Sequence, residues 1–268
     1  MGAGELTLWA SIVKLMRAAA RIRWLRLAVA GWHFHVDAIS FTHDHIWDGT
    51  SLVLRKAVRQ YARHGHRVLD LGTGHLGLLA VYCALTCRVR AVAVDINEDY
   101  VENARLVAKA SHAMGIDFRQ SNWFSDVDGT FDVIFGNVPY VPTDVGTTPE
   151  QVQTHREIWD GGHDGLAPAR TILANAARFM KPEGFLLLGI NTAYIPRVET
   201  IGLIHSSEDL ELRKIVQSWI SPSEVYVLGL KDSYIRANPP EPTSERCPDN
   251  IEWSSGGLFD THVWGPHP

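Results

Sequence analysis

The sequence has few cysteines, no strong charge imbalance and no long uncharged apolar helix. Its three cysteines are Cys83, Cys87 and Cys247, an odd number without metal-ligand spacing, so we expect reduced thiols and no disulfide framework. Lys and Arg number 25 against 30 Asp and Glu, and a net charge of -5 gives no broad basic surface for phosphate backbones. The longest run free of charged side chains, residues 71–87, holds three glycines and predicts a loop followed by a buried helix instead of a bilayer span. The sequence thus predicts a soluble, cytoplasmic protein and disfavours nucleic-acid and membrane partners.

The composition that remains is that of a globular protein. Hydrophobic residues make up 46% and charged residues 21% of the 268 residues. This length fits one large domain, or one domain with a sizeable appendage. We expect an N-terminal helical or mixed cap over residues 1–47 and a main domain over residues 48–268.

From residue 66 onward, short apolar strands alternate with amphipathic helices. We expect strands over residues 67–71, 89–95, 116–120, 131–136 and 185–190, and helices over 76–86, 98–114, 166–180 and 208–219. Residues 225–230 and 261–264 are expected to pair as closing strands. Two long loops, 141–164 and 231–260, fall outside the alternation, and the first has the length of a lid. The alternation predicts an α/β fold with a mostly parallel sheet and helices on both faces.

A glycine-rich turn joins the first predicted strand to the first predicted helix. The string Asp-Leu-Gly-Thr-Gly-His-Leu-Gly runs from Asp70 to Gly77. Glycine permits a tight turn and lets a ligand lie against unpaired N–H groups at a helix start. Asp95, at the end of the second predicted strand, is placed to hold two ribose hydroxyls. These residues predict a site for an adenosine-containing cofactor, either a dinucleotide or another nucleoside.

Three strings then resemble one family. Asp70-Leu71-Gly72-Thr73-Gly74 resembles the first motif of class I S-adenosylmethionine-dependent methyltransferases, and Asn137-Val138-Pro139-Tyr140 resembles the Asn-Pro-Pro-Tyr motif of enzymes that methylate amino or amide nitrogens. Gly161-Gly162-His163-Asp164-Gly165-Leu166 looks like the Gly-Gly-x-Asp-Gly-Leu string of the release factor glutamine methyltransferases. The resemblance covers about residues 30–195 in order. It implies a Rossmann-like class I methyltransferase fold, with a seven-stranded sheet whose last strand is antiparallel.

The resemblance also implies the site residues. S-adenosylmethionine is expected to be held by Asp70, Gly72, Thr73, Gly74, Gly77, Asp95, Ile96, Asn122, Trp123 and Asn137. The methyl acceptor is expected to be presented by Asn137, Val138, Pro139 and Tyr140.

The acceptor set has a chemical reason. Methyl transfer from a sulfonium is an in-line displacement, so the enzyme gains most by aiming the lone pair of the nucleophile at the methyl carbon. An NH2 group can donate one hydrogen bond to the side-chain oxygen of Asn137 and one to the Val138 carbonyl, which directs the nitrogen lone pair. Tyr140 can stack on a planar acceptor or form a wall beside it.

Two departures from the family favour a changed acceptor. Val138 replaces a proline, and only Thr50 is recognisable where the family carries Pro-Arg-Pro-Glu-Thr-Glu. We therefore expect an N-methyltransferase acting on an amine or amide nitrogen of a small molecule. Three alternatives stay open: a glutamine side chain in a protein release factor, a nicotinamide-dependent oxidation, and a catalytically silent subunit that binds the cofactor. The oligomeric state is open too.

The histidines carry less information. Four of them, His33, His35, His43 and His45, form two His-x-His pairs, but no supporting cysteine or carboxylate pattern accompanies them, so we expect no metal site. Asp164 is expected to have a structural role near a helix start instead of acting as a general base.

Overall fold

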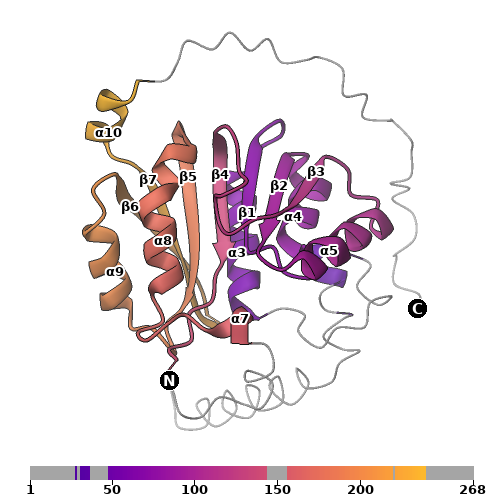
Figure 1. Ribbon diagram of the computed structural model, residues 1–268, viewed down its shortest axis with the longest axis horizontal. Helices are drawn as coiled ribbons and strands as arrows, with labels where there is room; N and C mark the ends of the chain where they lie inside the picture. Colours follow the sequence, from indigo (N-terminus) through magenta and orange to yellow (C-terminus); the bar gives the residue numbers. More distant parts are fainter. Residues whose placement is uncertain (1–27, 29–30, 37–47, 144–155, 220, 240–268) are drawn as a thin grey trace, which may run out of the picture.

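Seven strands form one sheet in the computed structural model, which describes residues 28, 31–36, 48–143, 156–219 and 221–239 (Figure 1). The strands are β1 (Arg67–Leu71), β2 (Arg90–Asp95), β3 (Ile116–Gln120), β4 (Phe131–Asn137), β5 (Met180–Asn191), β6 (Leu210–Ser218) and β7 (Ser221–Leu230). Their order is β3-β2-β1-β4-β5-β7-β6. Neighbours from β3 to β5 are parallel, whereas β7 is antiparallel to β5 and β6. The predicted sheet of seven strands with an antiparallel last strand is confirmed.

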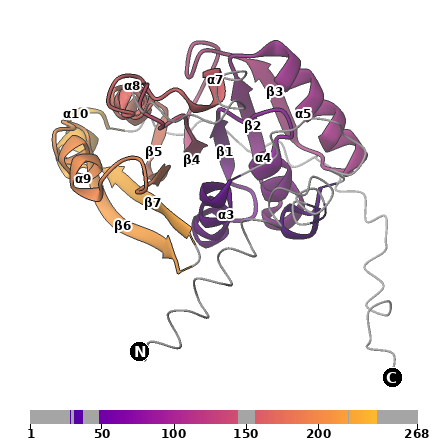
Figure 2. The same ribbon diagram turned by 90° about the horizontal axis from the view of Figure 1, so that it is seen from below.

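Helices cover both faces of the sheet (Figure 2). α3 (Gly49–Tyr61), α4 (Leu78–Tyr82) and α5 (Glu98–Ala110) pack on one face, and α8 (Ala167–Asn175) and α9 (Arg197–His205) pack on the other. Two short helices, α7 (Arg156–Trp159) and α10 (Asp232–Ala237), lie in the connections. Side chains alternate between the faces along each strand: Val68 joins the core under α4, and Leu69 joins the core under α8. Both faces are therefore buried, as a parallel sheet requires.

The strand order reverses between β1 and β4. The chain runs outward from β1 through β2 to β3, and then returns to the other side of β1 as β4. In open α/β sheets, ligands bind outside the carboxyl ends of the strands at such a switch point. The glycine turn after β1 and the Asn137 motif after β4 therefore meet at the same edge of the sheet.

Several predicted elements differ in the structure. The helix predicted for 208–219 is wrong, because Leu210–Ser218 form the edge strand β6. Its Glu, Lys, Arg and Gln are good helix formers, but pairing with β7 outweighs that local preference, and edge strands commonly carry charged side chains. The helix predicted for 76–86 is α-helical only over Leu78–Tyr82, and a π-helical turn, Cys83–Cys87, follows it.

The segment around Lys181 and Pro182 also differs. The helix predicted for 166–180 is α8 (Ala167–Asn175) followed by a 3-10 turn, Ala176–Phe179, and β5 already begins at Met180. Met180 pairs with Phe131 and Phe185 with Val133, so four residues stand opposite one residue of β4. Pro182 is accommodated because it lies in this bulge, where no ladder donor is needed.

Some predictions fall on undescribed residues. Most of the N-terminal cap 1–47, the strand 261–264 and much of both long loops lie outside the described residues, so the predicted domain boundary at 47/48 stays a prediction. Within the part of the chain that the structure describes, no helix has the length and apolarity needed to cross a membrane.

Candidate active site

The glycine turn after β1 is built from left-handed backbone. Gly72, Gly74 and Gly77 have φ values of +69°, +66° and +56°, which only glycine adopts without strain. A Cβ added to Gly74 would have no neighbour within 4 Å, and one added to Gly72 would meet only Trp123, at 4.0 Å. The turn therefore leaves open space beside its backbone, which is what a bound nucleoside needs. Gly77 instead allows close packing, since a Cβ there would lie 3.0 Å from Phe118.

Asp70 lies beneath this turn. Its carboxyl is 2% exposed and accepts a hydrogen bond of 2.9 Å from Thr73 Oγ1. Burial raises the pKa of Asp70 to about 7, although the bond from Thr73 opposes that shift. The predicted cofactor residues Asp70 and Thr73 thus support the loop from below.

Asp95 lies at the end of β2 and holds the other side of the turn. One carboxylate oxygen accepts a hydrogen bond from the Gly74 N–H at 3.0 Å, and the other accepts one from the Asn97 N–H at 3.0 Å. Each oxygen has further lone-pair capacity for ribose hydroxyls. Ile96 follows with 59% of its surface exposed, so an apolar side chain borders the carboxylate. The glycine turn, Asp95 and Ile96 fit an adenosine-containing group.

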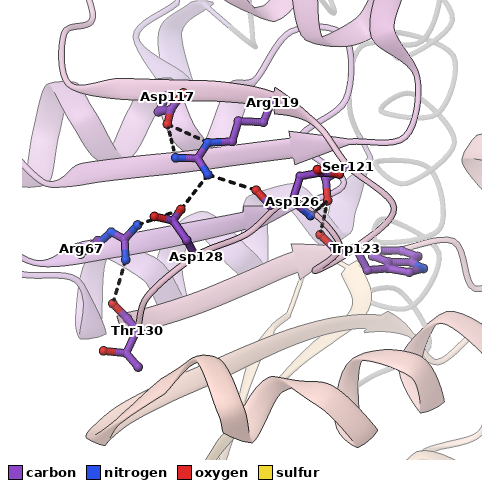
Figure 3. A network of polar contacts seen from close by, with 8 residues as sticks. All are labelled: Arg67, Asp117, Arg119, Ser121, Trp123, Asp126, Asp128 and Thr130. Carbon is purple, nitrogen blue, oxygen red and sulfur yellow. Dashed lines mark hydrogen bonds and ion pairs between the residues drawn. The ribbon is translucent and has the colours of Figure 1, made fainter. Parts of the chain in front are cut away.

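The loop after β3 carries Asn122 and Trp123 to the same edge. Trp123 has a left-handed φ of +54°, and its carbonyl accepts a hydrogen bond of 3.1 Å from Ser121 Oγ, which in turn accepts one from the Asp126 N–H at 3.0 Å (Figure 3). Arg119 donates to the Asp126 carbonyl at 3.0 Å and to the Asp128 carboxylate at 2.7 Å. These bonds fix the path of the loop, and Asn122 itself is exposed.

Asn137, the last residue of β4, has its carboxamide held on one side only. Its Nδ2 donates to Asp48 Oδ1 at 3.0 Å and to Ser51 Oγ at 3.1 Å. Its Oδ1 is buried and has no hydrogen-bond partner among the described residues. A buried acceptor without a partner is costly, so this oxygen is a candidate to receive an N–H from a bound molecule.

The rest of the motif is mostly buried. Val138 is 1% exposed, and its Cγ1 would lie 3.2 Å from a Cβ added at Gly136, while Pro139 is half-buried. Tyr140 is 3% exposed, and its hydroxyl donates to Asp48 Oδ2. Burial and the neighbouring Asp48 carboxylate raise the pKa of Tyr140 well above its usual range. Tyr140 is therefore a neutral, fixed wall of the site.

Asp48 and Ser51, which no motif in the sequence marks as site residues, hold Asn137 and Tyr140 in place. Asp48 is the N-cap of α3 and accepts from the Ser51 N–H at 3.0 Å. Thr50 and Ser223 extend the polar cluster, with Thr50 Oγ1 3.0 Å from the Tyr140 hydroxyl and 2.8 Å from Ser223 Oγ. An Asp directly before an amphipathic helix is a capping signal, but its contact with a residue 89 positions away leaves no mark in the sequence.

The segment resembling Gly-Gly-x-Asp-Gly-Leu braces the chain after β4. The Val141 N–H donates to the Trp159 carbonyl, and the Gly161 N–H donates back to the Val141 carbonyl, both at 2.8 Å. Asp164 accepts from the Leu166 N–H at 3.1 Å and pairs with Arg170, which lowers its pKa to about 2. Its contacts match the structural role expected for it. Among the described residues, no group of three His, Cys, Asp or Glu side chains lies close enough to hold a metal ion; His43 and His45 lie outside them.

Comparison with known proteins agrees with this geometry. Residues 31–155 match the family model "Methyltransferase small domain". The chain is 34% identical over 160 residues to a release factor glutamine methyltransferase of Agrobacterium fabrum, covering 57% of this chain and 53% of the relative. It is 36% identical over 155 residues to a ribosomal protein uL3 glutamine methyltransferase of Neisseria gonorrhoeae, covering 56% of this chain and 50% of the relative.

A solved structure shows the same fold. A methyltransferase from Pyrococcus furiosus superposes with a TM-score of 0.59 at 18% identity, covering 80% of this chain and 98% of that one. The chain spans about half the length of the curated relatives named above. On its sequence and its fold, this chain is a protein with the class I methyltransferase fold that resembles the release factor glutamine methyltransferases.

Proposed function

We propose that this protein is an S-adenosylmethionine-dependent methyltransferase whose acceptor is the carboxamide nitrogen of a glutamine side chain in a protein. The observation that carries the proposal is the buried Asn137 Oδ1, which has no partner among the described residues and lies at the end of β4. The sequence relatives are named for glutamine methylation of a release factor and of ribosomal protein uL3.

On the cofactor side, the chain supplies an open turn and a carboxylate. Bound S-adenosylmethionine supplies an activated methyl group on a positively charged sulfur. The N–H groups and open backbone at Gly72 and Gly74 let the cofactor approach closely, and Asp95 accepts from ribose hydroxyls. Asn122 and Trp123 border this position, because the loop after β3 is anchored by Ser121 and Arg119.

On the acceptor side, two oxygens receive the two N–H groups of a carboxamide. Asn137 Oδ1 accepts one, and the backbone carbonyl of Val138 accepts the other. With both hydrogens held, the nitrogen lone pair is directed at the methyl group, and this alignment favours an in-line transfer. The new C–N bond would form as the S–CH3 bond breaks, and the nitrogen would then lose one proton to solvent.

The replacement of proline by Val138 does not argue for a small-molecule acceptor. The valine side chain is 1% exposed and packs into the core around β4. Like proline, valine has a backbone carbonyl that can accept an N–H from the acceptor. The relatives likewise give no support to the small-molecule acceptor that the sequence departures favoured. A protein glutamine is therefore the acceptor we propose.

The experiment that tests this proposal offers both kinds of acceptor. Purified protein is incubated with S-adenosylmethionine and either a bacterial release factor, ribosomal protein uL3, or free primary amines and amides. Mass spectrometry of the digested proteins should find one glutamine carrying an added methyl group. Asn137→Ala should lose at least about 100-fold in turnover even at saturating S-adenosylmethionine. Methylation of the small molecules alone would overturn the proposed acceptor.

A further inference from the structure

We propose that Asp48 is the positioning residue that holds the Asn137 carboxamide in the orientation needed for methyl transfer. The inference deepens the proposed function, because it concerns the oxygen that receives the acceptor. Asp48 lies on the N-terminal side of α3, and Asn137 ends β4, so the contact joins two elements far apart in the sequence.

The orientation of the Asn137 carboxamide follows from which atoms can donate and which can accept a hydrogen bond. An ionised carboxylate has acceptors only, so the atom of Asn137 that lies 3.0 Å from Asp48 Oδ1 must be the NH2 group. If the carboxamide turned over, two oxygens would face each other at this distance with no hydrogen between them. The turned carboxamide would also offer its NH2 to an acceptor NH2, and two donors cannot bond. Asp48 therefore selects the rotamer that presents Oδ1.

Ser51 reinforces this selection. Its hydroxyl donates to Asp48 Oδ1 at 3.3 Å and so keeps a lone pair for Asn137 Nδ2, which lies 3.1 Å away. Asn137 Nδ2 thus donates to two acceptors, Asp48 Oδ1 and Ser51 Oγ. The Asn137 oxygen is left without a hydrogen-bond partner among the described residues.

A chain of buried hydroxyls holds Asp48 in turn. Tyr140 donates to Asp48 Oδ2, so Thr50, at 3.0 Å, must donate to the Tyr140 oxygen. Ser223 then donates to Thr50 at 2.8 Å, and Ser221 donates to Ser223 at 2.9 Å. Every hydroxyl points its hydrogen toward the carboxylate, and such aligned chains strengthen each bond. The Asp48 carboxylate is thus linked by hydrogen bonds to the start of β7.

The decisive variants separate this role from helix capping. Ser, Asn and Asp are all favoured N-caps, but a serine at position 48 is shorter and is not expected to reach Asn137. Asp48→Asn keeps an oxygen toward Asn137, and its NH2 group can donate to the Tyr140 hydroxyl if that hydroxyl donates to Thr50 instead. We expect Asp48→Ser to lower kcat about 10-fold to 100-fold, with the dissociation constant for S-adenosylmethionine within about 2-fold of wild type. Asp48→Asn should restore kcat to within about 3-fold of wild type.

A matched control accounts for lost stability. Asp132 lies at the opposite end of β4, accepts from the Arg67 N–H at 2.8 Å and pairs with Lys181 at 2.9 Å. Asp132→Asn should lower the melting temperature without lowering kcat. The proposal is overturned if Asp48→Ser keeps kcat within about 2-fold of wild type, or if Asp48→Asn is as slow as Asp48→Ser.

A second measurement is independent of the acceptor. Hydrogen exchange of the Asn137 side-chain NH2, followed by NMR, should be at least about 10-fold faster in Asp48→Ser than in wild type. Equal exchange rates would contradict the orienting role. If the wild type methylates none of the proteins offered, the proposed function fails, while the exchange rates still decide whether Asp48 fixes Asn137.

Discussion

At the scale of single residues, a buried carboxyl is the most pH-sensitive group of the glycine turn. Asp70 is 2% exposed, and burial raises its pKa to about 7 from an ordinary value of 3.8. Its bond from Thr73 Oγ1 forms in either protonation state, because one carboxyl oxygen remains an acceptor. The Asp70 side chain therefore supports the turn, and its buried surroundings disfavour the ionised form of its carboxyl group.

This shift predicts a pH-dependent stability of the cofactor-free protein. The folded state keeps the Asp70 proton that the unfolded state loses above pH 3.8, so the free energy of unfolding falls as the pH rises from about 4 to about 7. The loss is at most about 4 kcal/mol. Asp70→Asn keeps an acceptor for Thr73 and cannot ionise, so urea unfolding at several pH values should show a smaller decline. An identical decline in both proteins would assign the effect to other groups.

At the scale of elements, α3 links the motif Asn137–Tyr140 to the sheet. Its N-terminus carries Asp48, Thr50 and Ser51, while Leu54 further along is fully buried against the sheet. The close approach requires a glycine in β5, because a Cβ on Gly189 would lie 2.7 Å from Thr50 and 2.8 Å from Leu54. Packing of the helix and orientation of the motif are thus coupled.

Gly189→Ala should therefore damage both properties. The added methyl group must push α3 outward, which should cost about 1 to 3 kcal/mol of stability and lower kcat through Thr50 and Asp48. Gly202→Ala in α9 is the control, since a Cβ there meets nothing within 4 Å and alanine favours a helix by about 0.5 to 1 kcal/mol. In thermal unfolding, Gly189→Ala should have a lower melting temperature than wild type and Gly202→Ala a higher one. Only Gly189→Ala should lose turnover. If Gly189→Ala were destabilised but fully active, the packing of α3 would not control the orientation of the motif.

The elements differ in how well the sequence predicts them. Strands β1, β2 and β4 are short, apolar and bounded by turns, and the edge strand β3 is short and follows a glycine, so the sequence predicts the bounds of all four to within one residue. The sequence of the edge strand β6 wrongly predicts a helix, because it lacks strict alternation of apolar and polar residues, and few of its side chains are buried in the structure. Strand pairing with β7, a long-range interaction, decides its structure.

At the scale of the whole molecule, the proposed cofactor site is assembled from three connections. The turn after β1, the end of β2 and the loop after β3 each contribute one part, namely Gly74, Asp95 and Trp123. A ligand that contacts all three binds only the folded chain. Such binding must raise the stability of the whole protein.

S-adenosylmethionine should thus raise the melting temperature. At about 100 times its dissociation constant the ligand adds about 2.7 kcal/mol, which corresponds to roughly 5 to 10 °C for a chain of this size. Asp95→Ala should weaken binding about 10-fold or more, and at the same concentration the rise should be about half as large. Differential scanning fluorimetry checks both values as shifts relative to each ligand-free protein. Equal shifts would remove Asp95 from the cofactor site.

The sequence by itself determined the α/β alternation, the glycine turn and the motif after β4, because each depends on local backbone preference and on short-range spacing. Gly72, Gly74 and Asn137 are recognisable without coordinates for that reason. Only the tertiary structure decided which way the Asn137 carboxamide faces, since Asp48 reaches it across 89 positions. It also decided that the Val138 side chain is buried. Contacts of this kind depend on how α3 packs against the sheet, and no local pattern in the chain records that packing.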